Sequence, residues 1–512
     1  MIIQPISRPT RRMISTVRTL QPPFGGWNAR DNVTDMKPED AVVLDNIIPG
    51  DNSVETRNGY EDWCTGLPST IQALMEYSAI DGTNTLFAAT ATAIYNASSQ
   101  GAVGAASLGS LTNGRWQNVM FSTSGGNFLC CVNGADGVRT YDGAAWATQV
   151  LTGVTATTLV NVTSHIQRLW FAQVNTLKAW YLPVSSIAGA ATSIDLGPHS
   201  KLGGYLMAIA SWTRDGGSGM EDLGVFITSK GELHIFAGTD PSSSTTWEKV
   251  GTFKVAEPIG RKCFIKVGGD IGILTTQGLI PLSGVLNRAE SAQARVAITD
   301  KIRRAFSEAY DDAETAANWQ VQEYPVGKLL IINVPTVEDT SSMQFVMNSN
   351  TGAWCRFTGI NANCWALKGT DLFFGAPDGT VYRYSTTTDD GANIEGVAVH
   401  AFSKFGTDRT KYFKRIRPLI FGPTGYRPAV GLALDYSEEM STVSAPAATT
   451  AGTEWDLGDW DTTDWAPPSR TSALWQAMRG EGFSAAVVIG VNTPEKITYN
   501  GSTLLFEVGD AL

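Results

Sequence analysis

The sequence contains few charged side chains and very few histidines. Asp, Glu, Lys and Arg make up 17% of the 512 residues, below the roughly one quarter that is usual in globular proteins. The four histidines are scattered along the chain, as satisfied core or surface residues would be: His165, His199, His234 and His400. None has a partner at zinc-finger spacing, and the GxSxG, HExxH, P-loop and GxGxxG patterns are absent. We therefore expect no catalytic residue, no cofactor-binding residue and no metal ligand, and a protein that is not an enzyme.

Paired cysteines and long apolar runs are also missing. The six cysteines form no CxxC pair, which favours reduced and mostly buried thiols made in a reducing compartment: Cys64, Cys130, Cys131, Cys263, Cys355 and Cys364. Cys130 and Cys131 are neighbours in an expected strand, so their side chains should point to opposite faces. Residues 1–20 carry arginines but no apolar core, so we expect no signal peptide. No apolar run approaches about 18 residues, so we expect no membrane span.

The chain is acidic, with a formal net charge of −11. This argues against a general nucleic-acid binder, whose surface would be basic. It leaves room for a passage for DNA, because an acidic wall repels phosphates and prevents sticking. An ordinary acidic globular protein has the same charge, so charge alone does not separate these two readings.

Turn-forming and aromatic residues are abundant. The chain has 52 Gly, 15 Trp, 14 Tyr and 20 Phe, which indicates an all-β protein with many turns. Between about residues 71 and 390, a short β-branched or aromatic run is repeatedly followed by a tight turn and a second such run, as in a β-hairpin. The turn glycines Gly231 and Gly278 are 47 positions apart. A spacing on the order of 40–50 residues is that of one four-stranded propeller blade.

Seven candidate hairpins follow this pattern. Their turns fall near residues 91, 134, 175, 231, 278, 338 and 379. A single hairpin cannot bury its apolar face alone, and radial packing of blades solves this problem. We expect a β-propeller of about seven blades over residues 71–390, with an edge-rich pair of β-sandwiches as the alternative.

One stretch of the expected propeller, near residues 290–319, lacks strand alternation. Its apolar residues fall four apart, which predicts a helix packed on the propeller rim: Ile298, Ile302, Phe306 and Tyr310. We therefore expect one helical insertion in the propeller.

The two ends of the chain differ from the middle. Residues 1–70 begin with a basic segment that is either a disordered tail or an arm docking on an acidic neighbour; its arginines are Arg8, Arg11, Arg12, Arg18 and Arg30. Residues 37–44 could form one helical turn. Residues 391–512 are expected to form a separate β domain, with strands near 429–436 and 485–491. This domain has a basic patch at 404–417, comprising Lys404, Arg409, Lys411, Lys414, Arg415 and Arg417.

Two short segments have a weak likeness to known sites. Residues 242–247 faintly match the Asp-box turn of sialidases but lack its Asp and Gly. Residues 455–465 hold four carboxylates that could bind Ca²⁺, namely Asp456, Asp459, Asp461 and Asp464. The spacing is not that of an EF-hand, so an aromatic and acidic surface hairpin is the preferred reading.

Three stretches, in this order, carry a resemblance. The first is Gly25-Gly26-Trp27-Asn28, followed by Met36, Pro38, Asp40-Ala41, Leu44-Asp45-Asn46, Pro49 and Val54-Glu55-Thr56-Arg57-Asn58-Gly59-Tyr60. The second is Ile298 to Tyr310, then Leu330-Ile331-Ile332, Gly352-Ala353-Trp354 and Asp378-Gly379-Thr380-Val381-Tyr382. The third is Lys411-Tyr412-Phe413-Lys414-Arg415-Ile416-Arg417 with Tyr499-Asn500-Gly501 and Leu505-Phe506-Glu507. Together they resemble the tail hub or nozzle proteins of short-tailed bacteriophages, the packaged-DNA-stabilising group, over about half of the chain.

The resemblance implies a structural protein of the virion, made in the cytoplasm of the host bacterium. Six copies would form a ring below the portal and its adaptor, in contact with other tail proteins such as fibres or a needle. The ring would continue the DNA channel, retain packaged DNA and let it pass on ejection without sequence-specific binding. The competing function is a carbohydrate-binding or polysaccharide-degrading tail propeller, which would need a cleft with clustered aromatic residues and carboxylates.

Overall fold

The computed structural model describes residues 15–215, 220–243, 245–286, 293–423, 426–437 and 470–509. These residues divide into two compact units. The propeller unit comprises residues 58–352 and 356–386, and the terminal unit comprises residues up to 57, residues 353–355 and residues from 387 onward.

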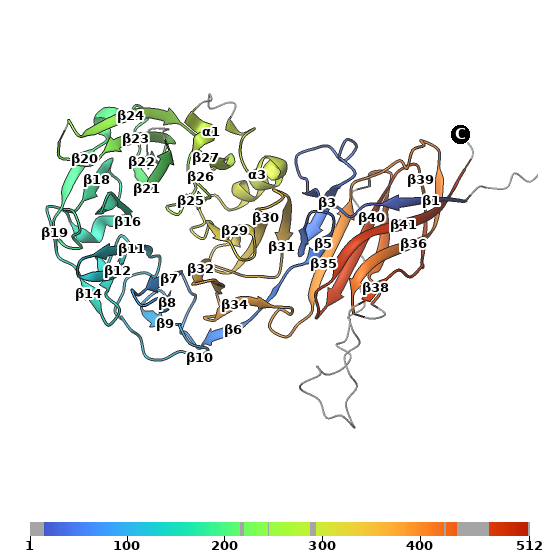
Figure 1. Ribbon diagram of the computed structural model, residues 1–512, viewed down its shortest axis with the longest axis horizontal. Coiled ribbons are helices and arrows are strands. Elements are labelled where there is room, and N and C mark those ends of the chain that lie inside the picture. Colours follow the sequence, from blue (N-terminus) through green and yellow to red (C-terminus); the bar gives the residue numbers. More distant parts are fainter. Residues whose placement is uncertain are drawn as a thin grey trace, which may run out of the picture. The chain divides into compact units, whose positions relative to one another are not determined.

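The propeller unit is a ring of seven β-sheets, which we number as blades one to seven in chain order of their first strands (Figure 1). Blade one contains β7 (Ala73–Ser78), β8 (Asn84–Ala89) and β9 (Ile94–Asn96). Blade two contains β11 (Gln117–Thr123), β12 (Gly126–Val132), β13 (Arg139–Tyr141) and β14 (Trp146–Thr148). Blade three contains β16 (Leu159–His165), β17 (Arg168–Gln173), β18 (Lys178–Tyr181) and β20 (Thr192–Asp195). Blade four contains β21 (Leu206–Asp215), β22 (Met220–Thr228), β23 (Glu232–Gly238) and β24 (Trp247–Lys254). Blade five contains β25 (Phe264–Val267), β26 (Asp270–Thr275) and β27 (Gly278–Pro281). Blade six contains β28 (Gln320–Tyr324), β29 (Leu329–Val337) and β30 (Ser341–Asn348). The expected all-β propeller of about seven blades is confirmed, and the alternative of paired sandwiches is wrong for this region.

Blade seven closes the ring with a strand from the start of the unit. Its β32 (Cys364–Lys368), β33 (Asp371–Gly375) and β34 (Val381–Thr386) are consecutive, and β6 (Gly59–Thr65) pairs antiparallel with β34, with Tyr60 opposite Tyr384. The two ends of the unit are therefore held in one sheet. The expected boundary at residue 70 was wrong, because residues 59–65 belong to the last blade.

Each of the seven expected hairpins lies in a different blade. The hairpin of blade four, for example, joins β22 to β23 through Gly231, and that of blade five joins β26 to β27 at Gly278. Both glycines have positive φ, +74° and +115°, a region that a side chain disfavours. The turn chemistry in the sequence was thus enough to find one hairpin in every blade.

Neighbouring blades share apolar cores. In β12 the side chain of Cys131 joins a core with residues of blade one, including Met75 and Phe87. The adjacent Cys130 joins a core with residues of blade three, including Leu159 and Phe171. The two thiols thus point to opposite faces of their strand, as alternation requires. All six cysteines are free and buried.

The helical insertion expected near residues 290–319 is described from residue 293 onward. Its described part includes η3 (Asp300–Ile302) and α3 (Arg303–Asp312). The shorter elements elsewhere in the propeller unit are α1 (Leu282–Leu286), η1 (Ala156–Thr158), η2 (Gly197–His199), β10 (Gly101–Ala102), β15 (Leu151–Thr152) and β19 (Gly189–Ala190). Ile302 and Phe306, two of the four residues of the expected apolar stripe, are buried, whereas Tyr310 is half-buried and Ile298 lies half-buried in a turn before η3. Phe306 packs against Trp319, with ring centroids 5.7 Å apart.

The terminal unit is built from both ends of the chain. One sheet contains β1 (Ser15–Leu20), β4 (Ile47–Pro49), β5 (Val54–Thr56), β36 (Lys411–Gly422), β38 (Arg470–Ser472), β39 (Gln476–Gly482) and β41 (Thr498–Val508). The other strands of the unit are β2 (Gly26–Trp27), β3 (Asp40–Asp45), β35 (Ile394–His400), β37 (Ala429–Leu434) and β40 (Ala485–Thr493); β31 (Trp354–Phe357) has residues in both units. His400 of β35 contacts Tyr499 of β41 through Nε2 and the hydroxyl, 3.0 Å apart, so the two groups of strands pack on each other.

Two expectations for the ends of the chain need correction. Residues 15–57 do not form a domain separate from the C-terminal one, because β1 and β5 pair with β41, and β3 pairs with β35. Residues 40–45 form a strand and not a helical turn, because Val42 and Val43 favour extended backbone and their neighbour Leu44 pairs opposite Ala398. The basic residues Arg8, Arg11 and Arg12 lie outside the described residues.

Candidate functional site

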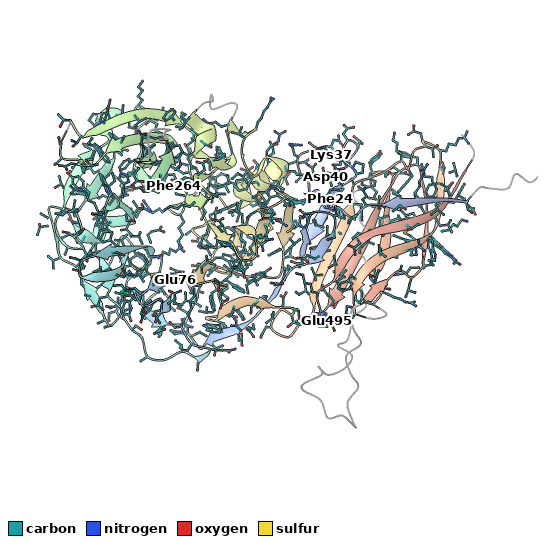
Figure 2. The ribbon with its side chains drawn as sticks, in the orientation of Figure 1. Phe24, Lys37, Asp40, Glu76, Phe264 and Glu495 are labelled. Atoms are coloured by element: carbon teal, nitrogen blue, oxygen red, sulfur yellow. The ribbon has the colours of Figure 1, made fainter. Side chains whose placement is uncertain are left out.

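A polar cavity lies on the axis of the propeller, among the first strands of the seven blades. Its volume is about 530 Å³, and every blade contributes lining residues, through β7, β11, β16, β21, β25, β28 and β32. Glu76 of β7 and Phe264 of β25 mark opposite sides of the ring's centre (Figure 2). We call this space the axial cavity.

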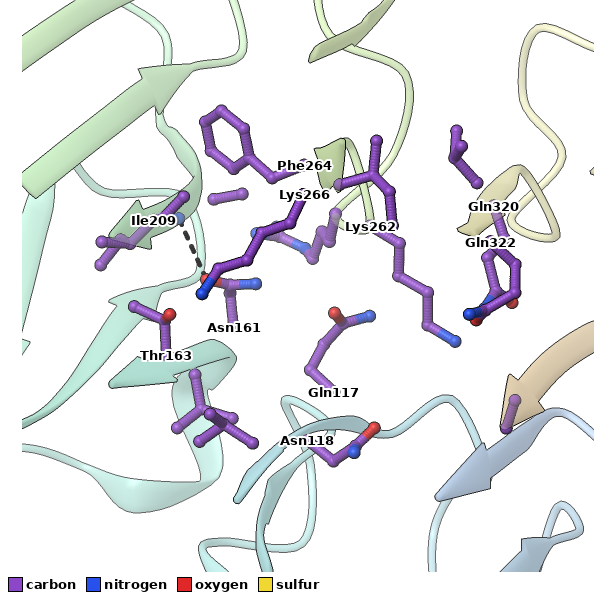
Figure 3. A pocket seen from close by; sticks show the side chains of 18 of the residues that line it. Gln117, Asn118, Asn161, Thr163, Ile209, Lys262, Phe264, Lys266, Gln320 and Gln322 are labelled. Atoms are coloured by element: carbon purple, nitrogen blue, oxygen red, sulfur yellow. Dashed lines mark hydrogen bonds between the residues drawn. The ribbon is translucent and has the colours of Figure 1, made fainter. Parts of the chain in front are cut away.

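Eight of the described residues that line the axial cavity carry amide or hydroxyl side chains. They come from four of the first strands, and those labelled in the close view are Gln117, Asn118, Asn161, Thr163, Gln320 and Gln322 (Figure 3). Residues two apart on a strand share a face, which brings Gln320 and Gln322 to the same side of β28. The first strands are therefore lined with groups that can both donate and accept hydrogen bonds.

Some of these amides also tie neighbouring blades together. The Oδ1 atom of Asn161 accepts the backbone N–H of Ile209 at 3.1 Å (Figure 3). Gln320 forms two bonds with the backbone of Trp365, accepting its N–H at 3.1 Å and donating to its carbonyl oxygen at 2.7 Å. Such bonds between adjacent blades fix the side chains, so this part of the wall is preorganised.

Blade five supplies the positive charge of the axial cavity. Arg261, Lys262 and Lys266 all line it, and the two lysines extend into it from the side of Phe264 (Figure 3). Arg261 donates to the carbonyl oxygen of Met207 at 3.1 Å and lies 5.6 Å from the ring centre of Tyr205. Lys262 and Lys266 make no hydrogen bond or ion pair within the part of the chain that the structure describes.

Burial disfavours the charges of Arg261 and Lys262. Removal from water lowers the pKa of Lys262, opposed by the Cys364 thiol, and it also lowers the pKa of Arg261. Glu76 is the one carboxylate among the described residues that line the axial cavity, and its Oε1 accepts the N–H of Gly369 at 2.6 Å. Burial raises the pKa of Glu76, while Gly369 and Lys368 act in the opposite direction. The wall thus holds three cationic groups and one carboxylate on a chain whose net charge is −11.

A second cavity of about 410 Å³ continues from the axial one. The two share Gln117, Arg261, Lys262 and Gln320, and the second adds residues of the loops that lead into the first strands. On this wall Arg115 pairs with Glu338 at 2.6 Å and Asp339 at 3.2 Å. The indole Nε1 of Trp116 is buried and has no hydrogen-bond partner among the described residues.

The four histidines and part of one of the two short segments with a weak likeness to known sites can now be placed in the structure. His165 of β16, His234 of β23 and His400 of β35 are buried, and His199 is exposed. No group of three His, Cys, Asp or Glu side chains close enough to hold a metal ion occurs among the residues described. Residues 242–243 follow Asp240, whose Oδ1 accepts the N–H of Ser242 at 3.1 Å, so this segment begins as an exposed turn. The cluster at 455–465 lies outside the described residues.

The basic patch at 404–417 is not a uniform surface. Lys404, Arg409, Lys414 and Arg415 are exposed, but Lys411 is fully buried. The ammonium of Lys411 donates to the carbonyl oxygens of Thr407, Arg409 and Phe483 at 2.6, 2.9 and 2.7 Å. Lys411 is therefore a structural residue, and its inclusion in a docking surface was wrong.

Sequence reasoning missed the residues of the axial cavity. Gln117, Asn161 and Gln320 are far apart in sequence, and each looks like an ordinary polar residue of a strand. The available signal was positional, because each lies at or near the start of the strand before an expected hairpin. Assigning the first strand of every blade would have placed them around one axis.

Comparisons with known proteins give the fold context. No family model matches the chain, and no curated protein matches it. Among similar solved structures are the β-propeller domain of Cps50 (Swd1) from Myceliophteria thermophila (10% identity, 64% of this chain, 100% of that chain, TM-score 0.41) and the structure of BBS1N in complex with ARL6DN (12%, 65%, 99%, 0.39). Another is YCF48 bound to D1 peptide (11%, 64%, 96%, 0.37). Similarities this weak say nothing about the function of this chain. Its propeller is assigned from the pairing of its own strands. Within the described residues, each helix is too short or too polar to cross a bilayer.

Proposed function

We propose that this chain is a structural protein of a phage tail, which forms the hub or nozzle ring below the portal and adaptor. The ring continues the DNA channel, retains packaged DNA and lets it pass on ejection. The proposal rests first on the resemblance of three stretches, in order, to the tail hub or nozzle proteins of short-tailed bacteriophages.

The pairing of two of these stretches is the observation that carries the proposal. Val54 of the first stretch lies opposite Tyr499 of the third, where β5 pairs with β41. Phe413 lies opposite Phe506, where β36 pairs with β41. Residues more than 400 positions apart are thus parts of one sheet. Parts of the first and third stretches of the resemblance therefore belong to one sheet, and most of the second stretch lies in the propeller unit, which supports reading the first and third stretches together.

The cavities give no support to the competing hydrolytic function. Glycoside hydrolysis uses two carboxyl groups flanking the bond that breaks. In the axial cavity Glu76 is the one described carboxylate, and in the second cavity Asp339 is paired with Arg115. A role as a wall of an assembly needs no such pair.

An exposed apolar strip supports self-association. On β36 the side chains of Leu419 and Phe421 are 39% and 46% exposed, and they alternate with the buried Ile416 and Ile420. Leu474 and Trp475 are 42% and 41% exposed and lie between the segments that pair with Ile420 and Ile416. We call these four residues the outer strip. Exposed apolar groups that gather on one sheet face are typical of protein contact sites.

The mass of the purified protein tests the proposal. We expect a closed ring of six copies by mass photometry and electron microscopy, and we expect Phe421→Glu to shift the mass toward the monomer. Val184→Glu is the matched control, because Val184 is 49% exposed on the propeller unit and lies outside the outer strip. A monomer at all concentrations, together with cleavage of a bacterial polysaccharide, would contradict the proposal.

The ring also tests where the negative charge lies. We propose that the acidic excess lines the lumen, where it would let DNA slide, and that basic residues dock on an acidic adaptor. Charge reversal at Arg409, Lys414 and Arg415 should weaken docking, and Lys411 is left unchanged because its burial would confound the result. A lumen lined mainly by Lys and Arg, or unimpaired docking, would show that these two assignments are wrong.

A further inference from the structure

We propose that the axial cavity binds a compact oxyanion bearing phosphate or carboxylate groups, held by Lys262 and Lys266 and by the surrounding amides. This site lies within the propeller unit and is independent of the proposed role in a phage tail. The cavity volume of about 530 Å³ falls within the range of small-molecule sites, on the order of 300–1,000 Å³. A duplex does not fit such a space, so the ligand is a small molecule.

The sign of the charge selects an anion. Three cationic side chains and one carboxylate line the cavity, although the whole chain has a net charge of −11. The carboxylate, Glu76, already accepts the N–H of Gly369. The cationic groups therefore outnumber the carboxylate. Lys262 is half-buried, so its field acts on a bound anion more strongly than at an open surface, and Lys266 is more exposed.

Lys262 is the residue that most needs a partner. Lys262 is half-buried, and an ammonium in such a place without a hydrogen bond or ion pair carries a desolvation cost, because the lower dielectric disfavours the charge. Lysine side chains in such places are normally paired or solvated. Lys411 of the same chain illustrates the usual solution, since all three of its N–H groups reach carbonyl oxygens. Lys262 has no such acceptors among the described residues, and an oxyanion in the cavity would supply them.

Neutral donors complete the site. The side chains of Gln117 and Asn118 line the cavity and make no hydrogen bond with any described residue, so their N–H groups are available. The adjoining cavity shares Gln117 and Lys262 with the axial one, so both residues can be reached from either space. Charged and neutral donors around one polar space are the arrangement that binds oxyanions, because ionised acceptors form the strongest hydrogen bonds.

Calorimetric titration tests the site with three probes: inorganic phosphate, pyrophosphate and citrate. We expect at least one probe to bind the wild-type protein at low ionic strength and to raise its Tm, since a ligand that binds only the native state stabilises it. Tighter binding of the two phosphates would identify a phosphate site, and tighter binding of citrate a carboxylate site; either supports the proposal.

Matched variants assign the binding to this cavity. Lys262→Met removes the charge at nearly constant length, and we expect affinity to fall on the order of tenfold or more while the unliganded protein keeps its Tm or gains. Lys178→Met is the control, because Lys178 is exposed on β18 outside the cavities, and it should bind like wild type. If Lys262→Met does not fold, Lys266→Met, at a more accessible position, takes its place with the same expected loss. The proposal is overturned if none of the three probes binds, or if the cavity variant and the control bind equally well.

Discussion

The two units of this chain build their sheets from neighbours at very different distances along the sequence. The four strands of blade three all lie within residues 159–195. In the terminal unit β41 pairs with β1, β5 and β36, which begin at residues 15, 54 and 411. Sheets made of consecutive strands can form early and locally, whereas the terminal unit needs both ends of the chain before its central strand β41 has all of its partners. The closing strand β6 is a comparable dependence in the propeller.

The largest expected effect comes from removing a buried charge pair that joins the two ends of the terminal unit. Arg57 donates from Nη1 and Nη2 to the two carboxylate oxygens of Asp389, at 2.7 and 2.6 Å, and from Nε to Asn46 at 2.9 Å. Its side chain is fully buried. Arg57→Ala should destabilise the terminal unit by about 3–5 kcal/mol, because it leaves Asp389 with an unpaired charge.

Hydrogen exchange measured by mass spectrometry separates the effect on the two units. Peptides of β36 and β41 should lose protection in Arg57→Ala, while peptides of β16 and β17 should keep it. Arg304→Ala is the matched control, because Arg304 pairs with Glu308 at 3.1 Å on an exposed face of α3, where such pairs contribute little. Equal loss of protection in both units would show that the units do not differ as we describe.

A second test uses two lysines of β36 that are three residues apart. Lys411 is buried with three carbonyl acceptors, whereas Lys414 is exposed and pairs with Glu507 at 3.3 Å. Lys411→Met should cost about 3 kcal/mol, since it strands three carbonyl groups away from water, and Lys414→Met should cost under about 1 kcal/mol. Urea denaturation followed by near-ultraviolet circular dichroism would measure both, and equal midpoints would contradict the structural role of Lys411.

The closing strand of the propeller gives the third test. Gly379 has φ +80°, and its carbonyl oxygen accepts the N–H of Leu67, just after β6, at 3.1 Å. A side chain at Gly379 would strain the backbone and also press on the carbonyl oxygen of Leu67. Gly359 has a similar φ, +84°, with open space around it, so Gly359→Ala carries the strain alone. We expect Gly379→Ala to cost about 2 kcal/mol and Gly359→Ala about 1 kcal/mol of propeller stability, measured as urea midpoints.

The same contrast explains what the sequence could predict. The turns at Gly231, Gly278 and Gly379 and the apolar runs beside them are local signals, so one hairpin in each blade could be found without a structure. The partners of β3 and β41 could not be found, because strand patterns carry no label for a partner several hundred residues away. The pairing of Val43 and Leu44 with the distant strand β35 overrode the weak helical signal of residues 37–44 for this reason. The axial cavity was missed on similar grounds, since its residues meet only after seven blades close.

The smallest expected effect is a difference in acid sensitivity between the units. Burial lowers the pKa of His165 to about 4 and also lowers that of His234, both in the propeller, and it lowers the pKa of His400 to about 3 in the terminal unit. In the unfolded chain a histidine titrates near 6.5, so the unfolded state binds more protons below that pH. Each histidine therefore stabilises its unit fully above about pH 6.5, and this stability is lost as the pH falls toward the folded pKa.

Lowering the pH from 7.5 to 5.5 should cost about 1.4 kcal/mol for each fully buried histidine, and thus up to twice as much in the propeller as in the terminal unit. Hydrogen exchange at the two pH values, corrected for the intrinsic rate, reports each unit separately. His165→Gln should reduce the pH dependence of blades three and four and leave β35 unchanged, because the Nδ1 atom of His165 contacts only Ser211 Oγ, at 2.8 Å, in the adjacent blade. His400→Gln should do the reverse, because Nε2 of His400 contacts Tyr499 within the terminal unit. Equal loss of stability in both units over this pH range, unchanged by either variant, would contradict the prediction. The acid sensitivity of both units would then come from groups other than these histidines.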